Sequence, residues 1–238
     1  MVDIAMFIIV LAIGGTPHGT LLAPRAFLAP NTTTLWYFGE KDPYAMRYQY
    51  QIWRFLTPVF LHAGLAHLLT NCFSQLIFGS MIESMIGFWK TAGIYFASAV
   101  GGNLFSALVS NSPSVGASTA ISGLLGIYIG YIIVSWKAMD YPGSPRAQMV
   151  CFVAIIVILN VLIGTGSGDG ISYVDNYGHL GGLITGTTIS MFVVKAMGGR
   201  YQDYEKKVEL YGKILTAVYF LLGFILFYTV RNPPQIAH

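Results

Sequence analysis

Charged residues are scarce in this chain: lysine, arginine, aspartate and glutamate make up 10% of its 238 residues, whereas hydrophobic residues make up 55%. The mean hydropathy of +0.62 is too high for a soluble domain. Hydrophobic runs of about 17–25 residues are continuous rather than alternating, which favours spanning helices over barrel strands. We therefore predict an all-α, polytopic membrane protein, and the net charge of +3 gives no indication of nucleic-acid binding.

Cysteine is also scarce, and the motifs of metal-dependent chemistry are missing. Cys72 and Cys151 both lie in hydrophobic runs, so we interpret them as small core residues rather than a disulfide or metal pair. No His-Glu-x-x-His motif occurs, which argues against a zinc protease, and no lysine lies inside a hydrophobic run to support a serine–lysine dyad. We expect no metal and no cofactor.

One glycine-rich motif imitates another class of intramembrane enzyme. The residues Gly166-Ser167-Gly168-Asp169 match the Gly-x-Gly-Asp pattern of intramembrane aspartyl proteases. They stand in a polar, glycine-dense stretch, and no second aspartate occupies an apolar run. We therefore interpret this motif as part of a flexible loop.

The hydrophobic runs predict seven helices in a single domain over 1–238, without an internal repeat. The expected ranges are 4–15, 55–81, 91–109, 116–136, 149–164, 177–194 and 214–230. The first six would form a core over about 4–195, and the seventh, over about 213–230, would be an addition to it.

The longest connection, over about 16–54, is a candidate functional loop because of its length, and it carries the glycosylation sequon Asn31-Thr32-Thr33. Lysine and arginine are modestly enriched in the connections that are cytosolic if the N-terminus is cytosolic. This orientation places the long connection and the start of the 116–136 helix on the outer face.

Ser118 is the candidate nucleophile. It stands in the first turn of the helix expected over 116–136, directly after the helix-breaking stretch 111–115. Unpaired backbone N–H groups and the positive end of the helix dipole are what an oxyanion beside a reacting hydroxyl needs. The alternative is that Ser118 is only an N-cap and that its neighbouring glycines allow close packing.

Two histidines are expected at the depth of Ser118. His67 and His179, like Ser118, lie 16 to 18 residues before the expected cytosolic ends of their helices. At ~1.5 Å per residue all three lie ~24–27 Å from that interface, just beneath the outer surface. Polar groups at membrane depth are functional candidates, and Asn71 shares a helix face with His67.

Small residues give the two helices a means of close approach. Their glycines recur every four residues, at Gly126, Gly130, Gly178, Gly182 and Gly186. Such spacing lets backbones meet closely, which would bring His179 within hydrogen-bond reach of Ser118.

Over about residues 16–190 the chain resembles the rhomboid intramembrane serine proteases. The matching motifs, in order, are Trp53-Arg54, His62-Ala63-Gly64-Leu65-Ala66-His67-Leu68-Leu69-Thr70-Asn71, Gly116-Ala117-Ser118 and Asp175-Asn176-Tyr177-Gly178-His179-Leu180-Gly181-Gly182. The seventh helix is similar to the extra C-terminal span of eukaryotic, secretase-like members. One residue departs from the pattern: Thr119 stands where the family usually has glycine, and its β-branched side chain could narrow the oxyanion or substrate cleft.

The resemblance implies an intramembrane serine endopeptidase that cleaves single-span transmembrane proteins near the outer or luminal surface. It implies a Ser118–His179 dyad, with Asn71, His67 and the Ser118 N–H forming the oxyanion site. It places the protein among membrane lipid, and the seventh helix and the sequon favour a eukaryotic endomembrane or plasma membrane over a bacterial inner membrane.

Two other function classes are considered. One is a non-catalytic rhomboid-like protein that binds transmembrane clients for trafficking or degradation, although the retention of Ser118 and His179 favours the enzyme. The other is a channel or transporter, which would show broken helices or an internal repeat at mid-membrane.

Overall fold

The computed structural model describes residues 2–14, 28–165, 174–196 and 201–230, and within these ranges its regular secondary structure is helical, with one isolated bridge between Lys41 and Ser114. The helices, in chain order, are α1 (Val2–Gly14), α2 (Thr32–Phe38), α3 (Pro43–Tyr48), the 3₁₀ helices η2 (Ile52–Phe55) and η3 (Thr57–Phe60), α4 (Leu65–Ser74), the π-helical η4 (Gln75–Gly79), α5 (Ser80–Ile86), α6 (Phe88–Val109), α7 (Ser118–Ser135), α8 (Arg146–Thr165), α9 (Asn176–Val193) and α10 (Gln202–Thr229). The predicted helical membrane bundle is confirmed.

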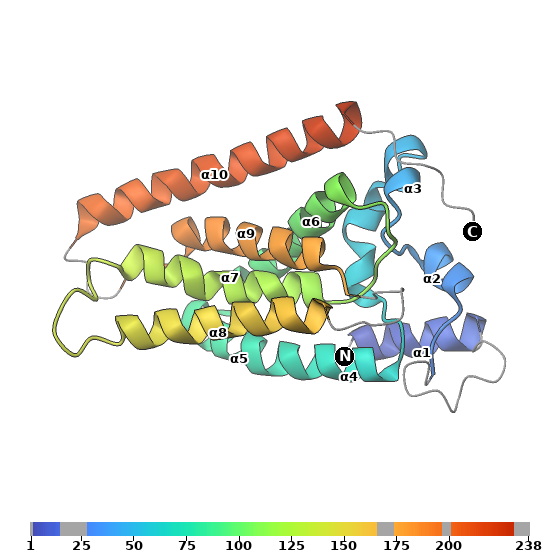
Figure 1. Ribbon diagram of the computed structural model, residues 1–238, viewed down its shortest axis with the longest axis horizontal. Helices are drawn as coiled ribbons and strands as arrows, with labels where there is room; N and C mark the ends of the chain where they lie inside the picture. The colour runs from blue at the N-terminus through green and yellow to red at the C-terminus, as the bar shows by residue number, and fades with distance from the viewer. Residues whose placement is uncertain (1, 15–27, 166–173, 197–200, 231–238) are drawn as a thin grey trace.

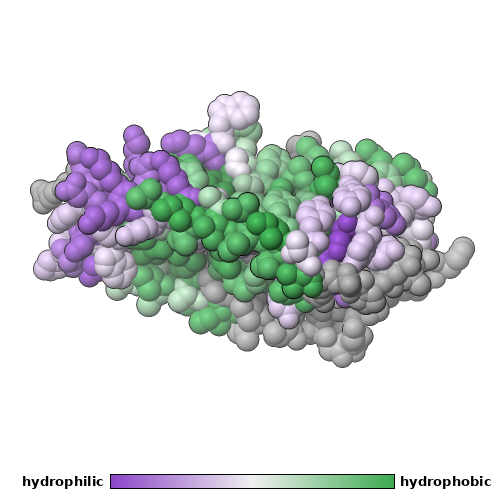
Figure 2. All heavy atoms as spheres, turned by 90° about the horizontal axis from the view of Figure 1, so that it is seen from above, coloured by the Kyte–Doolittle hydropathy of each residue, from purple (hydrophilic) through white to green (hydrophobic). Residues whose placement is uncertain are grey.

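The long helices lie roughly parallel and form one bundle (Figure 1). Of the described helices, four are long and apolar enough to cross a membrane: the continuous helix α4–η4–α5, α6, α7 and α10. The helix α7 lies innermost, with 78% of its apolar window buried, whereas α10 has 11% buried and forms one edge. Seen from the α10 side, hydrophobic side chains form a band between two hydrophilic ends (Figure 2), as expected of an integral membrane protein.

Two predicted boundaries are wrong. The second membrane helix begins at Leu65 rather than at 55, because residues 52–60 form the short helices η2 and η3. Pro58 lies at the start of η3, and its missing N–H would interrupt an α-helical ladder. The last helix begins at Gln202 rather than near 214. Acidic residues in its first turn complement the helix dipole, but a prediction from hydropathy does not include such a charged stretch.

The described part of the first connection, residues 28–54, contains short helices that are capped by side chains. The exposed Asn31 of the sequon caps α2 by accepting from Thr33 N at 2.8 Å, and Asp42 caps α3 by accepting from Tyr44 N at 2.9 Å. Buried Arg54 donates to the carbonyl oxygen of Glu40 at 2.7 Å. Residues 28–54 therefore form a layer at the end of the bundle where α7 and α9 begin (Figure 1).

The helices α7 and α9 meet at backbone contact distance through the predicted glycines. A methyl group added to Gly182 would lie 2.1 Å from Thr119 O, and one added to Gly186 would lie 2.0 Å from Gly123 O. No larger residue fits without separating the helices. The cysteines behave differently from the prediction: Cys72 is only partly buried and Cys151 is exposed on α8, so neither is a buried core residue; both are free thiols.

Candidate active site

Ser118 is the first residue of α7, and the turn before it is held by the backbone. Gly116 adopts φ of +129°, a left-handed conformation that favours glycine, and its N–H donates to Pro58 O at 2.9 Å. The N-cap is Ala117, which has no side-chain acceptor to offer. The interpretation of Ser118 as an N-cap is therefore wrong, and the N-cap residue makes no side-chain hydrogen bond to the start of α7.

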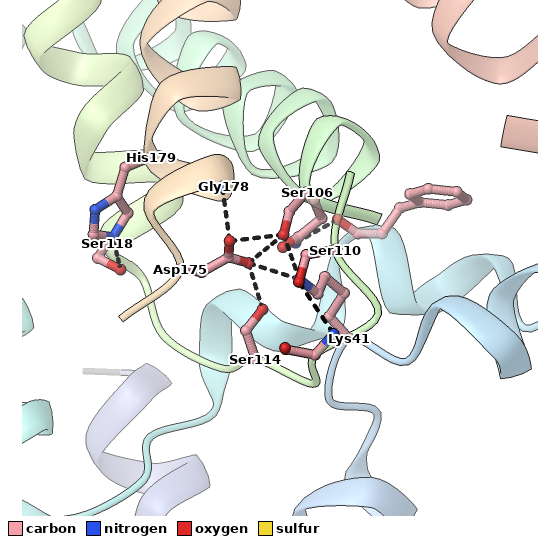
Figure 3. Close-up of polar contacts among 11 residues, drawn as sticks. Lys41, Ser106, Ser110, Ser114, Ser118, Asp175, Gly178 and His179 are labelled. Atoms are coloured by element: carbon pink, nitrogen blue, oxygen red, sulfur yellow. Dashed lines mark hydrogen bonds and ion pairs between the residues drawn. The ribbon is translucent and has the colours of Figure 1, made fainter. Parts of the chain in front are cut away.

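The first turn of α9 brings His179 to this hydroxyl. His179 Nε2 lies 2.8 Å from Ser118 Oγ, within hydrogen-bond distance (Figure 3). The two residues meet because α7 and α9 begin at the same end of the bundle and pack side by side. Nδ1 of His179 has no hydrogen-bond partner in the described part of the chain, so no carboxylate orients the imidazole as in a catalytic triad.

His67, near the start of α4, reaches the loop before Ser118. A methyl group built on Gly116 would lie 2.8 Å from His67 Nε2 and 3.6 Å from Ser118 Oγ, so both side chains border the same small space. Nδ1 of His67 accepts from Ala63 N at 3.3 Å. This contact turns the Nε2 edge of the ring toward the site.

The ring of His62 packs edge-to-face on that of His67, with the ring centroids 5.3 Å apart. His62 precedes α4 and is almost completely buried. Burial, and then the nearby His67 ring, lower the pKa of His62 to about 3, so its ring is neutral at physiological pH. His62 therefore supports His67 by packing rather than by charge.

Asn71 lies one turn after His67 and is buried. Its Nδ2 donates to the carbonyl oxygen of His67 at 2.8 Å, which uses one of its two N–H groups, and Oδ1 has no partner among the described residues. The structure therefore brings His179 into contact with Ser118 and His67 close to it, whereas Asn71 makes no hydrogen bond to Ser118 in the described part of the chain.

A buried ion pair beside the site was not anticipated from the sequence. Lys41 Nζ lies 2.8 Å from Asp175 Oδ2, and the side chains of Lys41 and Asp175 are 1% and 10% exposed. Asp175 also caps α9 by accepting from Gly178 N at 2.8 Å. The available signal was an aspartate just before a helix that starts with a candidate histidine, a common N-cap pattern. Nothing local to Lys41 indicated its partner.

The neighbouring Lys41 ammonium and the hydrogen bonds to Asp175 decide whether its carboxyl is ionised. Burial by itself would raise the pKa of this carboxyl, but Lys41 and the serine hydroxyls that donate to it outweigh burial and lower its pKa to about 2. Asp175 is therefore a carboxylate at physiological pH.

The side chain of Thr119 packs against glycines of two neighbouring helices. It is buried, and a methyl group added to Gly102 of α6 would lie 2.2 Å from Thr119 Cγ2. One added to Gly178 of α9 would lie 2.9 Å from Thr119 Oγ1. Thr119 thus fills space between two glycine faces. The expectation that it narrows the oxyanion or substrate cleft stays a prediction.

Other chemistry has little support in the described residues. They contain no group of three or more histidine, cysteine, aspartate or glutamate residues placed to hold a metal ion. The predicted absence of a metal and a cofactor stays a prediction. The glycine-rich motif at 166–169 lies outside the described residues.

Comparison with known proteins agrees with the geometry. The Rhomboid domain model matches residues 49–196, which is more than half of the chain. "Rhomboid-like protease 1" of Toxoplasma gondii is 41% identical over 175 residues, covering 73% of this chain and 57% of that protein. "RHOMBOID-like protein 6, mitochondrial" of Arabidopsis thaliana is 32% identical over 208 residues, covering 87% of this chain and 64% of that protein.

Not every relative is named as a protease. "Inactive RHOMBOID-like protein 8" of Arabidopsis thaliana is 31% identical over 165 residues, covering 69% of this chain and 44% of that protein. The chain spans less than two thirds of the length of each of these three relatives. The family model, together with these relatives, nevertheless shows that the chain belongs to the rhomboid family.

Proposed function

We propose that the protein is an intramembrane serine endopeptidase in which Ser118 is the nucleophile and His179 the general base. The distance of 2.8 Å between Ser118 Oγ and His179 Nε2 carries this proposal, because a base must lie within about 2.6–3.2 Å of the proton it removes. The relative named as a protease that is 41% identical supports the same activity. The substrates we propose are single-span transmembrane proteins.

The chemistry follows from the pair. With the proton of the neutral imidazole on Nδ1, His179 Nε2 accepts the hydroxyl proton while Ser118 Oγ attacks the scissile carbonyl carbon. His179 then gives this proton to the leaving amine as the peptide bond breaks. Water next attacks the acyl-enzyme ester while His179 Nε2 takes a proton from it. His179 then returns this proton to Ser118 Oγ as the ester C–O bond breaks, which releases the carboxylic acid product and restores both residues.

The oxyanion would be stabilised at the start of α7. Among the described residues, Ala117 provides no side-chain cap at the start of α7, and Asn71 uses one Nδ2 hydrogen within its helix. His67 borders the same space. Donors held in place before the reaction lower the barrier most, and removing one typically costs about 10²–10³ in kcat. Buried packing holds His67 and Asn71 in position for this role.

The cleavage site on the substrate follows from the position of the dyad. Ser118 is the first residue of α7, and α7 begins at the end of the bundle nearest α2 and α3 (Figure 1). We place this end at the outer or luminal membrane surface, and substrates should carry helix-destabilising residues near the cut, because a stable helix hides its peptide bonds.

The unit that does this is proposed to be the whole of 1–238: a core over about 4–195 with α10 added as a seventh helix. A eukaryotic endomembrane or plasma membrane is the proposed location, although a relative is named as mitochondrial. Fractionation of cells that express the tagged chain tests the location.

A second candidate function is kept because of one comparison. A relative named inactive is 31% identical, so rhomboid-like chains of this similarity can lack activity. Such a protein would bind transmembrane clients and steer their trafficking or degradation. The two functions differ in one measurement, since only the enzyme reacts covalently at Ser118.

Cleavage of a single-span reporter by the purified protein in liposomes tests the proposal. Ser118→Ala and His179→Ala should each reduce the cleavage rate by ~10³-fold or more, because the dyad acts as a unit. Ser135→Ala, which removes a buried hydroxyl from the opposite end of α7, is the matched control and should cleave normally. Cleavage by Ser118→Ala at the wild-type rate would refute the assignment.

A further inference from the structure

The dyad lacks a residue that orients its histidine directly, because Nδ1 of His179 has no hydrogen-bond partner in the described part of the chain. In a triad a carboxylate holds that nitrogen. The orientation of the ring here depends on where α9 begins and on where the loop before α7 lies. Whatever fixes these two backbone segments relative to each other also fixes the distance between Ser118 and His179.

The Asp175 carboxylate joins both segments. On the histidine side it accepts from Gly178 N at 2.8 Å, directly before His179 in the chain. On the serine side, Ser114 Oγ, four residues before Ser118, donates to Asp175 Oδ2 at 2.7 Å (Figure 3). One buried side chain therefore connects the nucleophile loop to the general-base helix.

Lys41 completes the junction from the first connection. Its ammonium donates to Asp175 Oδ2 at 2.8 Å and also to the hydroxyl of buried Ser106 on α6, which itself donates to Asp175 at 2.7 Å. The backbone of Lys41 pairs with that of Ser114, with Lys41 N donating to Ser114 O at 3.0 Å. The carboxylate thus collects donors from four separate segments of the chain.

We propose that the buried Lys41–Asp175 ion pair is the positioning element of the dyad, which sets the reaction geometry between Ser118 and His179 without touching the substrate. This inference rests on the proposed function. Burying a charged pair costs desolvation, so such a pair is weak evidence for stability alone. Its contacts to both halves of the site give it a second role, since a misplacement of about 1 Å can cost ~10²-fold in rate.

The test separates positioning from stability with three variants of the full chain. Asp175→Asn keeps an N-cap and a similar shape but removes the charge. Lys41→Met leaves the carboxylate buried without its cation, and the double variant K41M/D175N removes both charges. Asp140→Asn is the matched control, because Asp140 forms an exposed ion pair with Arg146 far from the site in sequence.

Two rates are measured in liposomes, at a temperature at which thermal unfolding shows every variant to be folded: reporter cleavage and covalent labelling of Ser118 by a fluorophosphonate probe. Both single variants should lower kcat and the labelling rate on the order of tenfold or more with KM unchanged, because the lost interaction acts in the transition state. The double variant should regain thermal stability relative to Lys41→Met without regaining kcat.

A milder pair of variants tests the loop contact. Ser114→Ala removes the hydroxyl that donates to Asp175, whereas Ser112→Ala removes an exposed hydroxyl from the same loop. Ser114→Ala should slow labelling several-fold, and Ser112→Ala should label at the wild-type rate.

Two results would overturn the inference. One is wild-type labelling and kcat in folded Asp175→Asn and Lys41→Met. The other is recovery of kcat together with stability in the double variant, which would reduce the pair to a structural role. Failure of the proposed function looks different, because then the wild-type chain itself would neither cleave the reporter nor label at Ser118.

Discussion

Gly182→Ala should separate the dyad by overpacking. The added methyl group would lie 2.1 Å from Thr119 O, which belongs to the backbone of α7 and cannot rotate away. Ordinary van der Waals contact for a methyl group lies at 3.4–4 Å, so α7 and α9 must move apart by at least about 1 Å beside Ser118. The 2.8 Å distance between Ser118 Oγ and His179 Nε2 would then exceed the range for direct proton transfer.

The magnitude follows from this displacement. A shift of about 1 Å can cost ~10²-fold in kcat, and forcing a methyl group into a packed contact costs about 1–3 kcal/mol of unfolding free energy. Steady-state cleavage of a single-span reporter gives kcat and KM, and thermal unfolding in detergent gives stability. We expect kcat to fall far more than the stability change alone would explain at a temperature where the protein stays folded.

Two controls test whether position matters. Gly93→Ala on α6 adds the same methyl group where no atom lies within 4 Å, so activity and stability should stay near wild type. Gly130→Ala overpacks α7 against Ser190, far along the helix from Ser118, so it should lower stability with a smaller effect on kcat. If Gly182→Ala cleaves as fast as Gly93→Ala, the close approach of these helices does not set the reaction geometry.

Two further expectations concern buried groups near the site. Burial raises the pKa of Glu40 to about 7 from 4.5, so the fold favours its protonated form, and the stability from this group is full below about pH 4.5 and is lost as pH rises through about 7. Glu40→Gln should remove up to about 2–3 kcal/mol of this pH dependence, measured as unfolding free energy at about pH 5 and about pH 8, and an unchanged slope would contradict the cause given. Thr119→Gly, which introduces the usual family residue, should lower the free energy of unfolding by about 1–3 kcal/mol. It empties the space between Gly102 and Gly178, and glycine loses more backbone entropy than threonine when the helix forms. A changed cleavage pattern on a reporter panel would show that Thr119 also narrows the cleft, and an unchanged pattern would contradict that expectation.

Much of the fold was accessible from the sequence because a bilayer leaves few choices. Backbone N–H and C=O groups in lipid must be hydrogen-bonded within their own segment, so continuous apolar runs predict helices. Six of the seven predicted helices have at least one end within a few residues of an observed helix end. The constant rise of an α-helix predicts Ser118 and His179 at one level, and the structure places these two side chains in contact.

The predicted starts of the second and seventh helices were wrong because features other than hydropathy determine where these helices begin. Pro58 diverts the chain into 3₁₀ turns before α4, and α10 extends through a charged stretch that apolar patterns do not include. The short helices of the first connection depend on caps such as Asp42. Such caps are short-range patterns that a search for long hydrophobic runs does not detect.

The sequence by itself determined the helical membrane class and the glycine spacing, since each depends on regular helix geometry or on composition. Only the tertiary structure decided which side of α7 faces α6 and α9, and hence that Thr119 fills a gap between the glycines of these helices. It also decided the pairing of Lys41 with Asp175, residues 134 positions apart. Such a contact has no local pattern, because it exists only after several helices have packed and closed off water from both charges.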